Sequence, residues 1–216
     1  MPDHLVPIPS PGVPLFFGEP GQPLVIVLHD WYGRLPWLEA IGRAFAHNGY
    51  RVVIPDLYHG VCTTDAATAE SLMLKLDVGE TLALIDDLVT DARAEGSVKV
   101  ASVGFSLGGW LALLHAQGGD VDAVAAYYAT LAESNHGVIP SPVLLHFAEI
   151  DTWEPGEEPE SFIARLKDHG TPVSDHSYLG TVHSFANATM VELVDTRAAA
   201  LAFARTVSFL GDHLGD

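Results

Sequence analysis

Short apolar runs alternate with helical patterns along most of the chain. Six runs rich in apolar and β-branched residues predict strands at 24–29, 51–55, 98–105, 123–128, 143–148 and 173–179. Stretches with apolar residues at helical spacing predict helices at 36–48, 71–95, 107–117, 160–169 and 189–214. Several strand candidates are apolar throughout, which is typical of strands covered on both faces. This order predicts right-handed βαβ units and a mostly parallel sheet flanked by helices on both faces.

The whole chain, residues 1–216, is expected to form one α/β domain. It is 48% hydrophobic and 18% charged, so it can bury a large core. Residues 1–23 are rich in proline and glycine and are expected to form an irregular arm or short edge strands, because proline is excluded from central strands. No insertion between the predicted strands is long enough for a separate lid domain.

One segment carries a chemical signature. Gly104-Phe105-Ser106-Leu107-Gly108 matches the pattern G-x-S-x-G between a predicted strand and a predicted helix. This is the context of a nucleophile elbow in the α/β-hydrolase fold. The nucleophile of such a turn has a strained backbone, and the flanking glycines avoid side-chain clashes. Ser106 is therefore the predicted nucleophile.

A serine hydroxyl needs a base, and elbow enzymes order the three catalytic residues as serine, acid, histidine. Asp151 lies just past the fifth predicted strand and is the predicted acid, with Glu149 as its nearest rival. His183 lies in the loop after the last predicted strand and is the predicted base, whereas His146 and His176 fall inside strands. His183 would take the Ser106 proton while Asp151 orients the imidazole.

An oxyanion formed during such a reaction needs two backbone donors. The N–H of Leu107, the residue after the nucleophile, is the first candidate. The second is expected in the loop after the first predicted strand, where the N–H of Trp31 is the choice. The Tyr32 side chain next to it is expected to pack in the wall of the site, which is compatible with lining a substrate pocket.

Composition argues against several classes of partner. The formal net charge is −18, which repels nucleic acid and anionic membranes, so neither is an expected partner. Cys62 is the single cysteine, so no intramolecular disulfide forms, and the first residues lack a secretory signal; both favour the cytoplasm. No Cys/His metal spacing and no nucleotide-binding motif occurs, so no cofactor is expected. The chain is expected to be a monomer or a homodimer.

From about residue 24 to its end, the sequence resembles the dienelactone hydrolase family. The residues that carry the resemblance are His29-Asp30-Trp31-Tyr32-Gly33, Pro55-Asp56-Leu57-Tyr58, Gly104-Phe105-Ser106-Leu107-Gly108-Gly109, Asp151 and His183-Ser184-Phe185. The resemblance implies a compact, lidless α/β-hydrolase fold. It also implies hydrolysis of lactones and small carboxylic esters without a metal or an organic cofactor.

The chain departs from the family pattern at its predicted site. Ser106 stands where the family's type enzyme has a cysteine, and Asp30 matches a glutamate that interacts with the resting thiol. Of two arginines that hold the substrate carboxylate in the type enzyme, one is matched by Asn187. The other should fall within residues 57–74, which contain no arginine or lysine. Arg34 could compensate from the first loop, although a solvent-facing position is the expected one.

The leading hypothesis is an esterase or lactonase that acts on a small-molecule ester or lactone through an acyl-enzyme on Ser106. Without the arginines, a neutral or differently charged substrate fits better than a carboxylate. Asp30, Tyr32, Arg34 and Asn187 are the candidate pocket residues. A thioesterase or peptidase on the same triad remains an alternative, as does a ligand-binding protein without catalysis on the same scaffold.

Overall fold

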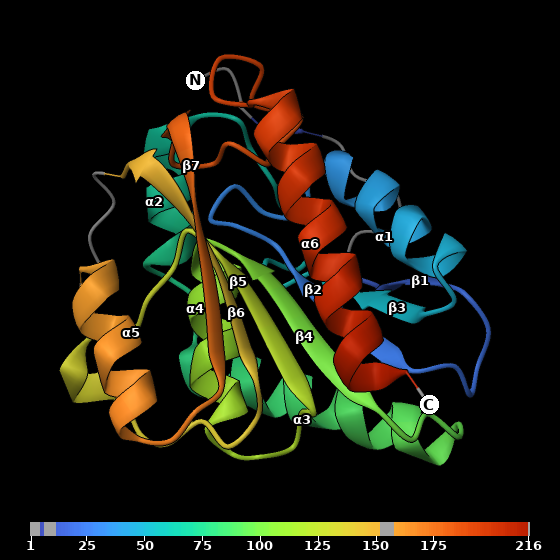
Figure 1. Ribbon diagram of the computed structural model, residues 1–216. Helices are drawn as coiled ribbons and strands as arrows, with labels where there is room; N and C mark the ends of the chain where they lie inside the picture. The colour runs from blue at the N-terminus through green and yellow to red at the C-terminus, as the bar shows by residue number, and fades with distance from the viewer. Residues whose placement is uncertain (1–4, 7–11, 152–157, 216) are drawn as a thin grey trace.

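A seven-stranded sheet forms the centre of the molecule, with the strand order β1-β3-β2-β4-β5-β6-β7. The structure, a computed structural model, describes residues 5, 6, 12–151 and 158–215. The strands are β1 (Leu15–Phe17), β2 (Leu24–Leu28), β3 (Arg51–Ile54), β4 (Val100–Phe105), β5 (Ala123–Tyr127), β6 (Val143–Ile150) and β7 (Val173–Val182). The helices are α1 (Trp37–His47), α2 (Ala66–Met73), α3 (Val78–Ala94), α4 (Leu107–Ala116), α5 (Pro159–Asp168) and α6 (Thr196–Leu214). Figure 1 shows the helices on both faces of the sheet.

The central strands are parallel and buried, as their apolar sequences predict. Every residue of β2, β4 and β5 is buried. Their registers place Val27 beside Val103, and Val103 beside Ala125. Only β1 runs antiparallel, at the edge beside β3. The prediction of a mostly parallel α/β sheet in a single domain is therefore confirmed, and the carboxyl ends of β2 to β7 meet along one edge.

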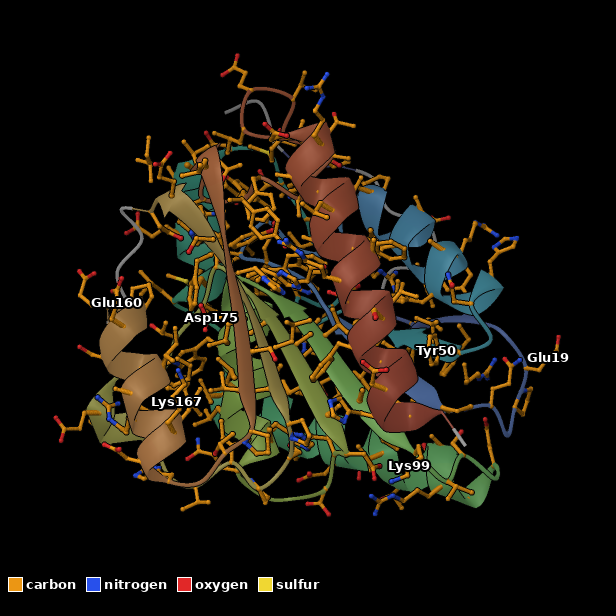
Figure 2. All side chains as sticks on the ribbon, viewed as in Figure 1. Glu19, Tyr50, Lys99, Glu160, Lys167 and Asp175 are labelled. Carbon is orange, nitrogen blue, oxygen red and sulfur yellow. The ribbon has the colours of Figure 1, made fainter. Side chains whose placement is uncertain are left out.

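Two hydrophobic cores lie on the two faces of the sheet. One core packs α1 and α6 against the sheet, with Phe45 and Leu210 among its buried side chains. The other packs α3, α4 and α5, with Ile85, Leu111 and Phe162 among its buried side chains. Charged side chains such as Glu19, Lys99, Glu160 and Lys167 lie at the periphery (Figure 2). No helix in the described part of the chain is long and apolar enough to cross a membrane.

The prediction of one helix over residues 71–95 is wrong, because two helices occupy this region. α2 begins earlier, after Asp65, whose carboxylate accepts the Thr68 N–H at 2.9 Å. α3 begins after Asp77, whose carboxylate accepts the Glu80 N–H at 2.9 Å. An aspartate at such a position satisfies a backbone donor at the start of a helix, so Asp77 favours a new helix at a point that apolar spacing does not mark.

The two ends of the chain also differ from expectation. The last helix starts at Thr196 rather than 189, because Asp195 caps it by accepting the backbone N–H groups of Arg197 and Ala198. Turns occupy the stretch before it. Within the predicted N-terminal arm, residues 15–17 form the single edge strand β1, and Leu5 forms an isolated bridge with Thr63. Residues 1–4 and 7–11 of that arm lie outside the described part of the chain.

A buried polar network ties β5, β6 and β7 to α6. The two ring nitrogens of His146 hydrogen-bond to the Tyr178 hydroxyl at 2.8 Å and to the Thr206 hydroxyl at 2.9 Å. The Tyr127 hydroxyl hydrogen-bonds to the same Thr206 oxygen at 2.7 Å. Burial lowers the pKa of His146 to about 3, so the ring stays neutral in the folded protein at ordinary pH.

This buried neutral histidine should make stability fall in mild acid. The unfolded chain protonates His146 below pH 6.5, whereas the folded protein does so only near pH 3, so the free energy of unfolding falls as pH falls between them. From pH 7 to pH 5 this histidine accounts for a loss of about 2 kcal/mol. Urea unfolding at both pH values should show that His146→Gln reduces the loss by about this amount. A variant with the same pH dependence as the wild type would contradict the assignment.

Candidate active site

Ser106 occupies the turn between β4 and α4 that its motif predicts. β4 ends at Phe105 and α4 begins at Leu107, so one residue makes the whole connection. Its backbone has φ 52° and ψ −115°, a conformation that L residues rarely adopt and that costs on the order of 1–3 kcal/mol. The Ser106 N–H donates to the Tyr127 carbonyl at 2.9 Å, which fastens the turn to β5.

The glycines of the motif are required because backbone segments approach closely there. A Cβ at Gly104 would overlap the Gly108 backbone, and a Cβ at Gly108 would overlap the carbonyl oxygens of Leu28 and His29. The first turn of α4 therefore lies directly against the end of β2. This contact brings the backbone of Leu107 close to the loop that carries Asp30 and Trp31.

The structure brings the three predicted side chains together. The Ser106 Oγ lies 2.7 Å from the His183 Nε2. The other ring nitrogen, Nδ1, lies 2.8 Å and 2.9 Å from the two carboxylate oxygens of Asp151. His183 directly follows β7, and Asp151 directly follows β6. The rival acid Glu149 instead accepts the Gly180 N–H at 2.6 Å, between the strands.

Sequence reasoning missed Tyr128 as part of this site. The residue directly follows β5. The centroid of its ring lies 4.8 Å from that of the His183 ring and 5.5 Å from that of the Phe185 ring. Its backbone has φ 41°, and its N–H donates to the His146 carbonyl at 2.6 Å. Tyr128 thus supports one face of the imidazole. Its place at the carboxyl end of a predicted central strand is the signal that could have found it.

The loop after β2 forms a tight turn at the same edge of the sheet. The Gly33 N–H donates to the Asp30 carbonyl at 3.1 Å, with Trp31 and Tyr32 at the centre of the turn. The Trp31 ring packs edge-on against the Tyr32 ring at 5.3 Å. Tyr32 is 5% exposed and belongs to the core, in line with a packing role.

Asp30 and Asn187 contact each other. Both side chains are fully buried, and the Asn187 Nδ2 donates to the Asp30 Oδ2 at 2.7 Å. The other carboxylate oxygen accepts the Tyr32 N–H at 3.0 Å. Burial raises the pKa of Asp30 to about 6, partly offset by these hydrogen bonds and by nearby His183. The Asn187 amide is therefore engaged by the protein itself.

The expectation that Arg34 faces solvent is wrong. Arg34 is 3% exposed, and its guanidinium donates a hydrogen bond to the carbonyl of Val13 in the N-terminal segment. Next to this loop, His29 accepts the Leu57 N–H at Nε2, 3.1 Å away. Burial lowers the pKa of His29 to about 4, so its ring is neutral. Arg34 and His29 stabilise the backbone around the first loop.

The chain matches the model of the dienelactone hydrolase family over residues 15–214. It belongs to this family. A curated relative from Azospirillum brasilense, named "Putative carboxymethylenebutenolidase", is 31% identical over 89% of this chain and 88% of its own. A carboxymethylenebutenolidase from Rhodococcus opacus is 29% identical over 88% of this chain and 81% of its own. This member of the family is therefore a hydrolase.

Solved structures agree on the fold. A protein from Klebsiella pneumoniae, described as a "Putative Dienelactone Hydrolase", superposes with a TM-score of 0.80. The match covers 97% of this chain and 98% of that one at 22% sequence identity, so it shows the α/β-hydrolase fold alone. No group of histidine, cysteine or acidic side chains in the described part of this family member is arranged to hold a metal ion.

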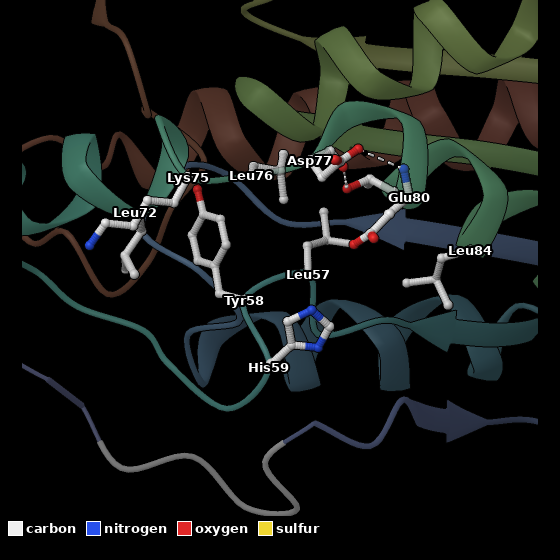
Figure 3. A pocket seen from close by; sticks show the side chains of 10 residues that line it. Leu57, Tyr58, His59, Leu72, Lys75, Leu76, Asp77, Glu80 and Leu84 are labelled. Carbon is white, nitrogen blue, oxygen red and sulfur yellow. Dashed lines mark hydrogen bonds between the residues drawn. The ribbon is translucent and has the colours of Figure 1, made fainter.

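A cavity of about 320 Å³ lies on the α3 side of the first loop. Leu57, Tyr58 and His59, which follow β3, form one wall. Leu72 of α2, together with Lys75 and Leu76 between α2 and α3, is part of the other (Figure 3). The Tyr58 ring contacts the His29 ring at 5.0 Å, so the cavity adjoins the first loop. Ser106, His183 and Asp151 are not among its lining residues.

We expect substitutions at two glycines, one at the elbow and one in α6, to have opposite effects on stability. Gly108→Ala should lower the free energy of unfolding by about 3 kcal/mol, because the new Cβ overlaps backbone that cannot give way. Gly211→Ala in α6 should raise it by about 0.5–1 kcal/mol, because alanine favours a helix and its Cβ would meet no atom within 4 Å. Guanidinium unfolding of both variants measures the difference, and equal midpoints would contradict the packing argument.

Proposed function

We propose that this protein hydrolyses a small, uncharged carboxylic ester or lactone, with Ser106 as nucleophile, His183 as base and Asp151 as the acid that orients it. The observation that carries the proposal is the continuous hydrogen-bonded chain from Ser106 Oγ through both His183 nitrogens to Asp151. Its position at a strained strand–helix turn agrees with the role of a nucleophile.

Acylation would begin when the Ser106 Oγ attacks the ester carbonyl carbon. Its proton passes to His183 Nε2, 2.7 Å away, and Asp151 stabilises the imidazolium through the Nδ1–H. When the tetrahedral intermediate collapses, the bond to the alcohol oxygen breaks and His183 returns the proton to that oxygen. The acyl group remains on Ser106.

Deacylation would repeat the sequence with water. His183 takes a proton from the water molecule, whose oxygen attacks the acyl carbon, and then gives that proton to Ser106 Oγ as the acyl bond breaks. The carboxylic acid leaves, and the free serine is restored. In a lactone, the alcohol released by acylation stays attached to the acyl chain, so the product is a single hydroxy acid.

The backbone N–H groups of Leu107 and Trp31 are the proposed oxyanion donors. Leu107 is the first residue of α4, and the first N–H groups of a helix have no acceptor within the helix. The positive end of the helix dipole adds to this effect. Trp31 lies in the turn that begins directly after His29, whose carbonyl Gly108 approaches closely, and this supports the pairing of these two donors.

The preference for an uncharged substrate rests on charge. Asn187, in place of a family arginine, donates to Asp30, and the Arg34 guanidinium donates to the Val13 carbonyl. Residues 57–74 contain no arginine or lysine, and the protein carries a formal net charge of −18. A substrate carboxylate would thus meet a negative field near buried Asp30 instead of a bidentate arginine pair.

Replacing the nucleophile tests the catalytic role. Ser106→Ala should reduce kcat for p-nitrophenyl butyrate by about a thousand-fold or more, because no other group can form the acyl-enzyme. Ser134→Ala, in an exposed segment, removes a hydroxyl that donates to Asn135 and should keep the wild-type rate. Equal rates for the wild type and Ser106→Ala would rule out the mechanism.

A pair of substrates tests the charge preference. We expect kcat/KM for p-nitrophenyl butyrate to exceed that for the p-nitrophenyl monoester of succinic acid by about ten-fold at low salt, since the free carboxylate is repelled. The ratio should narrow in 0.5 M salt, where the screening length is about 4 Å. Faster hydrolysis of the succinate monoester would show that a cation binds the substrate after all.

A further inference from the structure

Asp30 is a buried carboxylate that the proposed mechanism does not use. It lies just after β2, in the loop that carries the proposed oxyanion donor Trp31. Both of its oxygens are bound: Oδ1 accepts the Tyr32 N–H at 3.0 Å, and Oδ2 accepts the Asn187 amide at 2.7 Å. The Ser106 hydroxyl, in contrast, hydrogen-bonds to His183.

Asn187 belongs to the loop that carries His183. Its backbone N–H donates to the Ser184 carbonyl at 2.9 Å, and its side-chain oxygen accepts the Thr189 N–H at 3.0 Å. Its side-chain amide points toward Asp30, 157 positions earlier in the chain. One hydrogen bond therefore connects the histidine loop to the first loop, inside the protein and away from solvent.

The charge of Asp30 acts on several neighbouring groups. His183 lies close enough to stabilise its ionised form. Tyr58, after β3, and Tyr128, after β5, lie near it as well, and Tyr32 lies in the same loop. Burial is the main cause that raises the pKa of these three hydroxyls, and the negative charge of Asp30 raises it further. Asn187 is the neutral donor among these groups.

We propose that Asp30 is a positioning residue, which with Asn187 links the oxyanion loop to the histidine loop and places a negative charge that favours the imidazolium form of His183. This inference rests on the proposed function. Asp30 exchanges no proton in it: the Ser106 proton goes to His183 Nε2, and the Asp30 charge stabilises the ion pair that results. Asp30 therefore acts through His183, unlike a carboxylate that contacts the nucleophile directly.

The pH dependence follows from burial. With a pKa of about 6, Asp30 is ionised at pH 8 and loses its charge as the pH falls through 6. The imidazolium loses support over the same range, so Asp30 contributes to the acid limb of the rate profile. Above pH 6, where the wild-type Asp30 is charged, replacing it by a neutral residue makes the imidazolium less favourable, and this moves that limb to lower pH.

The test measures phosphonylation of Ser106 by a fluorophosphonate from pH 5 to pH 9, because this reaction needs the serine and the histidine but no natural substrate. Asp30→Asn should react about ten-fold more slowly at pH 8, the equivalent of one pKa unit of lost support, with its acid limb at lower pH. Asp122→Asn makes the same change at the opposite end of β4 and β5, where Asp122 pairs with Lys99, and should leave the profile as in the wild type.

A double variant separates the link from simple loss of packing. Asp30→Asn with Asn187→Asp keeps the hydrogen bond between the two side chains and the one from the Tyr32 N–H, since the new amide accepts that N–H and donates to the new carboxylate. The negative charge moves from residue 30 to residue 187, its hydrogen-bond partner. We expect this swap to restore the melting temperature lost in Asp30→Asn and to recover most of the reaction rate.

The outcomes are distinct. If Asp30→Asn matches the wild type at every pH, or is slow with an unmoved acid limb, or if the swap stays as slow as the single variant, the inference is overturned. If the wild-type protein is not labelled at Ser106, the proposed function fails and the inference falls with it. Labelling of the wild type together with unchanged variants overturns the inference alone.

Discussion

The close approach of backbone segments around Ser106 is the constraint on which the rest of the site depends. The proposed nucleophile is presented by a turn of one residue, and that turn exists only because Gly104 and Gly108 leave room for neighbouring backbone. The same contact presses the start of α4 against the end of β2, so the helix N-terminus and the first loop share one small region. Steric fit at two glycines thus determines where charge can be stabilised.

Much of this arrangement could be predicted from the sequence because its signals are local. Buried strands are apolar throughout, and Asp151 and His183 directly follow two of them. The loops after parallel strands lie along one edge of the sheet, so chain order already indicates that these residues are close together. Contacts between residues far apart in the sequence have no such signal. The contact between Asp30 and Asn187 spans 157 positions, and neither residue type predicts the other.

Other differences have their own physical reasons. The start of α3 at Val78 depends on a side-chain hydrogen bond from Asp77, which apolar periodicity does not detect. Arginine is usually exposed, so its residue type favours solvent for Arg34, whereas the N-terminal segment covers it and supplies a carbonyl acceptor. Tyr128 looks in the sequence like the apolar end of a strand, although the loops after strands are where ligands bind in this class of fold.

Backbone strain is concentrated at the same edge of the sheet as the proposed active site. In the described part of the chain, the non-glycine residues with positive φ are His59, Ser106, Tyr128 and Ser184, and each lies in the connection after a different parallel strand. Each such residue costs on the order of 1–3 kcal/mol, so this strain lowers local stability at that edge. On heating, the edge that carries the proposed site should therefore loosen while the sheet beneath it is still intact, and loss of hydrolase activity should precede global unfolding.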